Sequence, residues 1–272
     1  MSLVVQTNVA AFDTHRYLTQ SSANMAKSME RLSSGYRINR AADDAAGLAI
    51  SQKLEAQIGG LDQAQRNAQD AVSLVQTGEG ALSEVQAMLQ RVRDLAVQFN
   101  NGTLSTADKA AITLEVAQLC AEVDRIGTQT QFNGIALLTG GASITFQVGS
   151  NDGETLGITG RSLFGSGASF DIDSAIFNFG SGTVTLASID TAIGNVSTAR
   201  ATFGAVQNRL EHTLNNLASY EENLTASESR IKDVDMAQEM TTFTKYQILQ
   251  QAGTSMLAQA NAAPQSVLSL LR

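Results

Sequence analysis

Residues able to carry out catalysis are scarce in this chain. There are two histidines, His15 and His212, and one cysteine, Cys120. Neither histidine belongs to a His-Glu-x-x-His pair or to any spacing typical of zinc ligands, and no phosphate-binding glycine motif is present. His212 lies beside a row of apolar residues at helical spacing, which favours a structural or exposed histidine over a ligand. We therefore predict no catalytic residue, no metal site and no cofactor.

Adjacent carboxylates at Asp43 and Asp44 form the most conspicuous acidic pair. Neighbouring side chains on a helix diverge by about 100°, so the pair lacks the geometry of an acid–base dyad. Carboxylates are favoured near the positive N-terminal end of the helix dipole. The pair therefore predicts the start of a helix.

A single cysteine excludes a disulfide within the chain. Cys120 follows Leu119 in a row of apolar helical positions, which predicts a buried, unreactive thiol. The alternative is a cross-link between two molecules.

Long helices must position these residues, because apolar side chains recur at alternating steps of three and four. The first apolar row occupies residues 54–99, about 70 Å of helix at 1.5 Å per residue. The second, residues 112–126, begins after Ser105, whose hydroxyl can cap the helix together with Asp108. The third covers residues 196–231. Three such rows can bury one another in an antiparallel coiled-coil bundle.

Two further apolar rows, one at each end of the chain, have no partner in this bundle. Each is a single stripe on a polar helix, and an isolated helix of this length is marginal in water. We expect these helices to be loosely ordered in the free subunit and to fold against neighbouring copies; the alternative is that they cap one globular core. The rows are Leu18, Met25, Met29 and Leu32 near the start, and Leu249, Ala252, Met256, Ala260, Ala263, Val267 and Leu270 near the end.

A proline interrupts the last of these rows. Pro264 lacks a backbone N–H, so we expect a kink or a local break of the helix at that position.

The centre of the chain, about residues 131–195, is rich in glycine and predicts a small β region. Asn133 and Gly134 predict a turn just after the second helix. Apolar and polar residues alternate on both sides of an Asn-Asp-Gly turn at 151–153, which predicts a β-hairpin. Val184 with Leu186 favours one more short strand, and residues 165–181 are interpreted as an exposed loop.

Composition excludes several classes of partner. With 272 residues, 43% of them apolar, the chain can bury the core of one large or two small domains. Its net charge of −8 disfavours nucleic acid, because phosphate binding needs a basic surface. No segment has the roughly 20 consecutive apolar residues that span a bilayer, and the first residues do not resemble a secretory signal. We expect neither a nucleic-acid partner nor a membrane partner.

Distinctive sequence motifs occur in both halves of the chain. In the first half they occupy residues 31–40 (Arg-Leu-Ser-Ser-Gly-Tyr-Arg-Ile-Asn-Arg), 42–50, 76–82, 90–97 and 130–134. In the second half they occupy residues 229–235, 247–255, 257–261 and 267–272. These motifs resemble those of bacterial flagellins, and the resemblance covers roughly the first 140 and the last 75 residues.

The resemblance implies a mostly α fold, a long antiparallel coiled-coil helical bundle of two domains, D0 and D1, with a small β-hairpin region at about 131–195. By correspondence, D0 consists of residues 1–40 and 235–272, and D1 of residues 41–234. It also implies a non-enzymatic subunit that self-assembles into the extracellular filament used for swimming, without outer domains. The implied polymerisation core is Leu18, Met25, Met29, Leu32, Leu249, Met256, Val267 and Leu270.

The resemblance further implies several partners. Flagellins are exported by the flagellar type III system with the help of an export chaperone, and they meet filament cap and hook-junction proteins. Toll-like receptor 5 contacts flagellins at a motif corresponding to residues 90–97 and at an acidic residue of the next helix, and cytosolic NAIP receptors sense a segment corresponding to residues 267–272. The implied receptor-binding residues are Gln90, Arg91, Leu95 and Glu115.

Two alternative functions share this architecture. One is a hook-filament junction protein, and the other is a surface flagellin homologue that binds polysaccharide.

Within the receptor motif at residues 90–97, Asp94 stands where flagellins commonly have glutamate. This change bears only on the fine affinity for Toll-like receptor 5.

Overall fold

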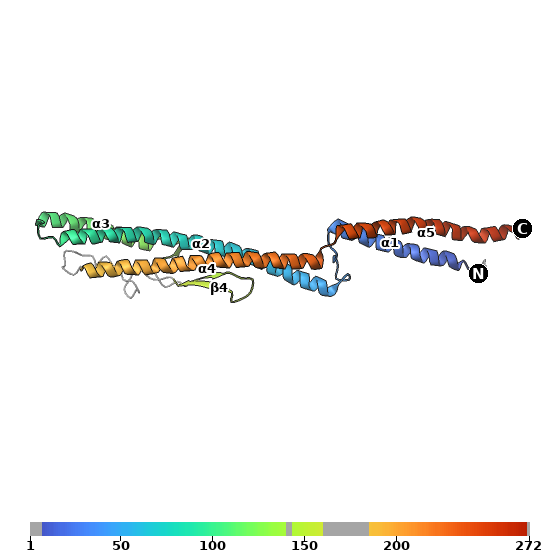
Figure 1. Cartoon of the computed structure of the whole chain (residues 1–272), viewed down its shortest axis with the longest axis horizontal. Helices are drawn as coiled ribbons and strands as arrows, with labels where there is room; N and C mark the ends of the chain where they lie inside the picture. Colours follow the sequence, from blue (N-terminus) through green and yellow to red (C-terminus); the bar gives the residue numbers. More distant parts are fainter. Residues whose placement is uncertain (1–6, 140–142, 160–184, 271–272) are drawn as a thin grey trace. The chain divides into compact units, whose positions relative to one another are not determined.

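The computed structural model describes residues 7–139, 143–159 and 185–270, with side chains up to residue 263 in the last helix (Figure 1). The prediction of a mostly α fold with a helical bundle and a small β region is confirmed. In chain order the elements are α1 (Val9–Ser34), α2 (Ala45–Phe99), α3 (Thr106–Gln129), β1 (Gln131–Phe132), β2 (Ile135–Ala136), β3 (Ser143–Gln147), β4 (Thr155–Thr159), α4 (Leu186–Lys232) and α5 (Met236–Leu270).

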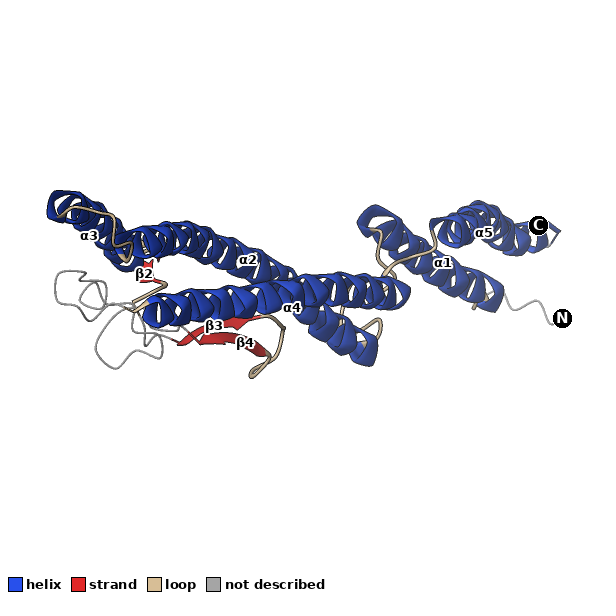
Figure 2. Ribbon diagram, turned by 60° about the vertical axis from the view of Figure 1, so that its left-hand side comes forward, coloured by secondary structure: helices blue, strands red, loops and turns tan. Residues whose placement is uncertain are grey.

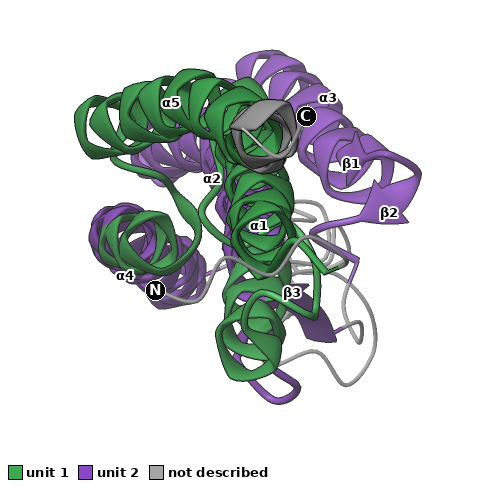
Figure 3. Cartoon of the chain, turned by 90° about the vertical axis from the view of Figure 1, so that its right-hand side faces the viewer, with its two compact units in different colours: residues 1–56, 223–272 green, residues 57–222 purple. Residues whose placement is uncertain are grey.

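The chain divides into two compact units, which Figure 3 colours separately. The terminal unit contains residues 1–56 and 223–272, and the central unit contains residues 57–222. The residues assigned to D0 by resemblance, 1–40 and 235–272, fall in the terminal unit together with the adjoining ends of α2 and α4.

Helix ends follow the capping signals of the sequence. Ser105 and Asp108 form a reciprocal capping box at the start of α3, as predicted. At the start of α2, Asp44 accepts a hydrogen bond from Gly47 N at 2.9 Å, which confirms the helix-start interpretation for this residue.

Asp43 has a different role, in the loop before α2. Its carboxylate accepts from Lys27 Nζ at 2.6 Å and from the backbone N–H groups of Asn39 and Arg40. The hydrogen bond from Lys27, helped by the two backbone donors, holds the pKa of Asp43 below its usual range. Asp43 therefore fastens the α1–α2 loop back onto α1.

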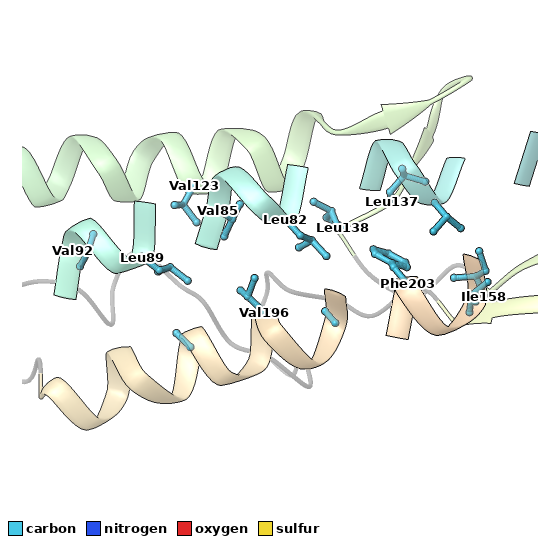
Figure 4. Close-up of a cluster of buried hydrophobic side chains, with 14 of the residues drawn as sticks. Leu82, Val85, Leu89, Val92, Val123, Leu137, Leu138, Ile158, Val196 and Phe203 are labelled. Carbon is cyan, nitrogen blue, oxygen red and sulfur yellow. The ribbon is translucent and has the colours of Figure 1, made fainter. Parts of the chain in front are cut away.

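The core of the central unit lies between α2, α3 and α4, and Figure 4 shows its side chains facing one another. Arg93 of α2 pairs with Asp190, and Glu79 pairs with Arg200, so α2 and α4 run antiparallel. The predicted apolar rows on α2 and α3 supply this core, and so does the row on α4 up to Leu217. That row begins earlier than predicted, at Ile189 and Ala192, and its predicted member Tyr220 is 43% exposed. Fully buried members include Leu61, Val75, Leu82, Val85, Leu89, Val92, Ile189 and Leu210.

Both predicted turns of the β region are present. Asn133 and Gly134 have φ of 50° and 78° between β1 and β2, which is the left-handed pair that a two-residue hairpin turn requires. β3 and β4 pair antiparallel, with Ile144 opposite Ile158, and lie beside the bundle in Figure 2. The side chain of Asn67 donates to Gln147 O at 3.1 Å and fastens this hairpin to α2.

One strand prediction is wrong. Leu186, expected in a short strand, begins α4, so the β region does not extend to residue 195. The Thr185 hydroxyl accepts a hydrogen bond from Ser188 N at 3.3 Å and so starts a helix where β-branched residues favoured a strand. Val184 and the loop expected at 165–181 lie outside the described residues.

In the terminal unit α1 and α5 form an antiparallel pair. Asn8 contacts Ala260, Ser21 contacts Tyr246, and Arg31 contacts Glu239, so positions rise along one helix as they fall along the other. α5 runs from Met236 to Leu270 and passes through Pro264, so the predicted local break is wrong.

Candidate assembly surface

The α1–α5 pair has an inverted distribution of polar and apolar residues. The buried residues of α1 are Ser21 and Ser28, and α5 buries Glu239. Many large apolar side chains stay exposed, although soluble helices normally turn such a face toward a core. The exposed ones are Val9, Phe12, Tyr17 and Met29 on α1, and Met236, Met240, Ile248, Leu249 and Met256 on α5.

Small residues let the two helices approach closely. A Cβ on Gly253 would lie 3.2 Å from Leu18 Cδ1, and the Ser21 hydroxyl donates to Tyr246 O at 3.3 Å. Cα atoms of the two helices come within 8 Å of each other along the pair. The contact therefore joins backbone to backbone and buries few large side chains.

A shallow groove of about 450 Å³ follows this contact. Its walls are largely apolar and come from both helices, including Tyr17, Leu18, Leu249 and Met256. We call this groove, together with the exposed apolar side chains of α1 and α5 named above, the terminal apolar surface.

The residues assigned to the polymerisation core are distributed unevenly over this surface. Met29, Leu249 and Met256 are 49%, 46% and 60% exposed. Leu18, Met25 and Leu32 are half-buried in the pair. Val267 and Leu270 belong to the last turns of α5, and their side chains lie outside the described part of the structure.

Sequence reasoning missed several exposed apolar residues, among them Phe12, Tyr17 and Ile248. They are not members of the two predicted terminal rows, so a search for a single narrow row passes over them. Tyr17 directly precedes Leu18 and Ile248 directly precedes Leu249, so a search for a wider stripe would have found these two. Phe12 lies six residues before Leu18, and periodicity gives no signal for it.

An ion pair lies inside the pair of helices. Arg31 Nη1 is 3.6 Å from Glu239 Oε2, with the two side chains 27% and 11% exposed. Within the described residues, Arg31 Nε and Glu239 Oε1 are buried without a hydrogen-bond partner. A buried ion pair that leaves such groups unsatisfied contributes little net stability to the helix pair.

The linkers next to α1 and α5 are tied together more firmly. Arg37 N donates to Lys232 O at 2.7 Å, and Val234 N donates to Gly35 O at 3.0 Å, around an antiparallel bridge between Tyr36 and Asp233. Gly35 takes φ of 77° as the left-handed cap of α1. This joint holds one end of the helix pair.

The residues assigned to receptor binding lie on α2 and α3 of the central unit. Glu115 Oε1 accepts from Arg91 Nη2 at 2.7 Å and from Arg91 Nε at 3.0 Å, so the two predicted contacts form an ion pair with each other. Gln90 is exposed on the same helix. Leu95 is 2% exposed and belongs to the bundle core.

An exposed leucine adjoins this ion pair. Leu114, next to Glu115 on α3, is 68% exposed. It stands outside the apolar row of α3, so periodicity alone gave no signal for it.

Cys120 is buried in the core of the central unit. Burial, with a smaller effect of Asp124, raises the pKa of its thiol to about 12. The thiolate is the reactive form, so the prediction of an inert thiol has a physical basis here.

We expect Cys120 to react with a thiol reagent at pH 8 roughly a hundredfold or more slowly in the native chain than in denaturant, because the thiolate is nearly absent. The measurement is the rate of absorbance change with an aromatic disulfide reagent, with and without guanidinium. Equal rates in both conditions would place the thiol at the surface and favour cross-linking between molecules.

Residues 7–139, 143–159 and 185–270 contain neither a cluster of metal ligands nor a membrane-spanning helix. No group of three or more His, Cys, Asp or Glu residues there could hold a metal ion. No helix in the same residues is both long and apolar enough to cross a membrane.

Comparison with known proteins identifies the family. Residues 5–143 match the bacterial flagellin N-terminal helical region, and residues 186–271 match the bacterial flagellin C-terminal helical region. A flagellin of Halalkalibacterium halodurans is 49% identical over 273 residues, covering 99% of this chain and 100% of the relative.

Other relatives agree. A flagellin of Bacillus subtilis is 47% identical, covering 97% of this chain and 98% of its own length. A flagellar filament 33 kDa core protein of Treponema phagedenis is 45% identical, covering 99% of this chain and 100% of its own length. The chain therefore belongs to the bacterial flagellin family and is a structural, non-enzymatic subunit of the extracellular flagellar filament.

Proposed function

We propose that subunits of the filament pack against one another through the terminal apolar surface. The observation that carries this proposal is the inversion of the α1–α5 pair, which buries Ser21 and Ser28 and exposes Met29, Leu249 and Met256. Burying a leucine or methionine side chain stabilises a contact by about 1.5–3 kcal/mol. Contact with further copies supplies that burial, and a single chain does not.

In this proposal the inner domain D0 consists of residues 1–40 and 235–272, and D1 of residues 41–234. The polymerisation core lies in D0. It comprises the half-buried Leu18, Met25 and Leu32, the exposed Met29, Leu249 and Met256, and Val267 and Leu270 near the end of α5. Electron microscopy and sedimentation of the purified chain under filament-promoting conditions test it. A chain that assembles alone fits a filament subunit better than a hook-filament junction protein.

The proposal extends to export. We infer that the chain leaves the cell unfolded through the flagellar type III system, with an export chaperone bound to α5 before the chain meets the hook-junction and cap proteins. The composition supports this, because one cysteine and one proline leave no internal disulfide and few slow steps in refolding. Absence of the chain from the medium of a strain with an inactivated flagellar export apparatus would support it, and continued secretion would contradict it.

We also propose that Arg91 and Glu115, with Gln90 beside them, form the surface that Toll-like receptor 5 contacts. The pair is exposed, with side chains 56% and 45% accessible, so it is available as a preformed charged unit. Leu95 is buried, and its role here is to hold α2 in place rather than to contact the receptor. Recognition of residues 267–272 by NAIP receptors is a separate proposal, which rests on the resemblance of that segment.

Replacing Arg91 by alanine should lower activation of a Toll-like receptor 5 reporter by at least tenfold, because arginine anchors commonly dominate interfaces. The matched control is Arg66→Ala, which removes an exposed arginine paired with Asp62 on the same helix. Unchanged signalling by Arg91→Ala would reject this site. Leu95→Ala is unsuitable as a test, because emptying a core position destabilises the bundle itself.

A further inference from the structure

The proline of this chain alters one carbonyl group inside α5. In an α-helix, the N–H at position 264 would donate to the carbonyl of Ala260, but proline has no N–H. α5 nevertheless continues through Pro264 to Leu270. The chain contains one proline, so within α5 only the Ala260 carbonyl is deprived of its helical donor by the sequence itself.

Asn8, just before α1, supplies a donor to that carbonyl. Its side-chain Nδ2 donates to Ala260 O at 2.8 Å, across a sequence separation of 252 residues. Its Oδ1 accepts from Ala11 N at 3.1 Å and caps the start of α1. The two partners fix the orientation of the amide, because a backbone N–H can only donate and a carbonyl can only accept.

The joint around Gly35 and Val234 holds the register at one end of the helix pair, and Asn8 and Ala260 lie at the other end. The contact between α1 and α5 is made by small residues at short range, such as Ser21 and Gly253, and it buries few large side chains that could interlock. Away from that joint, a slide of α1 by one turn, about 5.4 Å, would preserve much of this small-residue contact, so the contact itself does little to set the register.

We propose that Asn8 and Pro264 act as a matched pair that sets the register of α1 on α5. Pro264 opens an acceptor at Ala260, and the capping amide of Asn8 fills it. After a slide of one turn the Asn8 amide would face carbonyls that already have a helical N–H donor, and the Ala260 carbonyl would lose its partner. The residues thus position the two terminal helices and contact no ligand.

The register of α1 on α5 can be measured in the full-length chain as the equilibrium formation of a disulfide between two introduced cysteines. Leu18 Cβ lies 3.8 Å from the position of a Cβ on Gly253, which matches the separation in natural disulfides. The reporter is therefore Leu18→Cys with Gly253→Cys, equilibrated in a glutathione buffer at low protein concentration and quantified by mass spectrometry. Leu18→Cys with Leu249→Cys or Leu257→Cys reports a slide of one turn in either direction.

Asn8→Ser is the informative variant, because serine retains a capping hydroxyl but does not reach Ala260. We expect it to lower the equilibrium constant of the in-register disulfide about tenfold, since a hydrogen bond is lost and a carbonyl is left unsatisfied. The disulfides that report a slide should rise correspondingly. In a Pro264→Ala background, where the N–H at 264 is restored, Asn8→Ser should change the in-register constant less than about twofold.

Three results would overturn the proposal. An equal loss in both backgrounds would mean that Asn8 acts through its cap alone. No effect of Asn8→Ser with Pro264 present would mean that the bond to Ala260 does not set the register. Failure of the parent reporter to form the 18–253 disulfide would contradict the pairing of the helices itself.

Discussion

Deleting residues 236–272 should abolish filament growth while the central unit, residues 57–222, stays folded. The deletion removes all of α5, and with it half of the terminal apolar surface and the partner of α1. The core of the central unit contains no residue of α5, so its stability should be nearly unchanged. Sedimentation and electron microscopy measure assembly, and the thermal transition of the remaining helices measures folding.

A substitution at full length isolates the apolar contribution. Replacing Ile248, Leu249 and Met256 by serine keeps the chain length and removes three exposed apolar side chains. If each is buried in the filament at about 1.5–3 kcal/mol, the critical concentration for assembly should rise at least a hundredfold. The matched control replaces the exposed residues Gln247, Gln251 and Gln259 of the same helix by serine.

The critical concentrations of the apolar and the glutamine variants separate loss of apolar burial from loss of helix stability. A large effect of the apolar set alone supports assembly through the terminal apolar surface. Equal effects of both sets would indicate that serine merely weakens the helix. Normal filaments from the deletion variant would reject the proposed role of α5.

The second large effect is expected in the core of the central unit, at Leu89. Leu89 belongs to α2, and its side chain is 1% exposed in the core that α2 forms with α3 and α4. Leu89→Ala should therefore lower the free energy of unfolding by about 2–5 kcal/mol. The measurement is chemical denaturation followed by circular dichroism, with the transition of the central unit fitted separately.

Leu114→Ala is the matched control, because it makes the same chemical change at a residue that is 68% exposed. It should shift stability by less than about 0.5 kcal/mol. Similar losses in the two variants would contradict the burial pattern of the bundle.

The bundle could be predicted from the sequence because its apolar rows are long and regular. Leu61, Leu82 and Leu89 all belong to the predicted row at residues 54–99, with its alternating steps of three and four, and all are buried. The turn at Asn133 and Gly134 was predictable for a different reason, since only particular residues adopt paired positive φ angles.

Counting a narrow row misjudged the width of the buried face. Leu74 and Leu95 lie beside the row and are nevertheless buried, because α2 packs against both α3 and α4. A helix with two neighbours buries a wider stripe than a two-stranded coiled coil does. Leu95, which the resemblance to flagellins implies as a receptor contact, is one of the residues in this wider buried stripe.

The candidate assembly surface was harder to predict than the bundle. Periodicity showed that the terminal helices carry apolar side chains, but it does not say whether those side chains face each other or a different molecule. The inversion around Ser21 and Ser28 became visible only with the register of α1 on α5, which depends on Asn8 and Ala260, more than 250 residues apart.

The shielding of Cys120 has a practical consequence for imaging. Because the sulfur is enclosed in the bundle, a cysteine introduced on the exposed face of α3 would be the readily modified thiol of the native chain. A maleimide dye would then attach at one chosen position per subunit without any replacement of the natural residue. Successive dyes of different colour would mark old and new lengths of a growing filament.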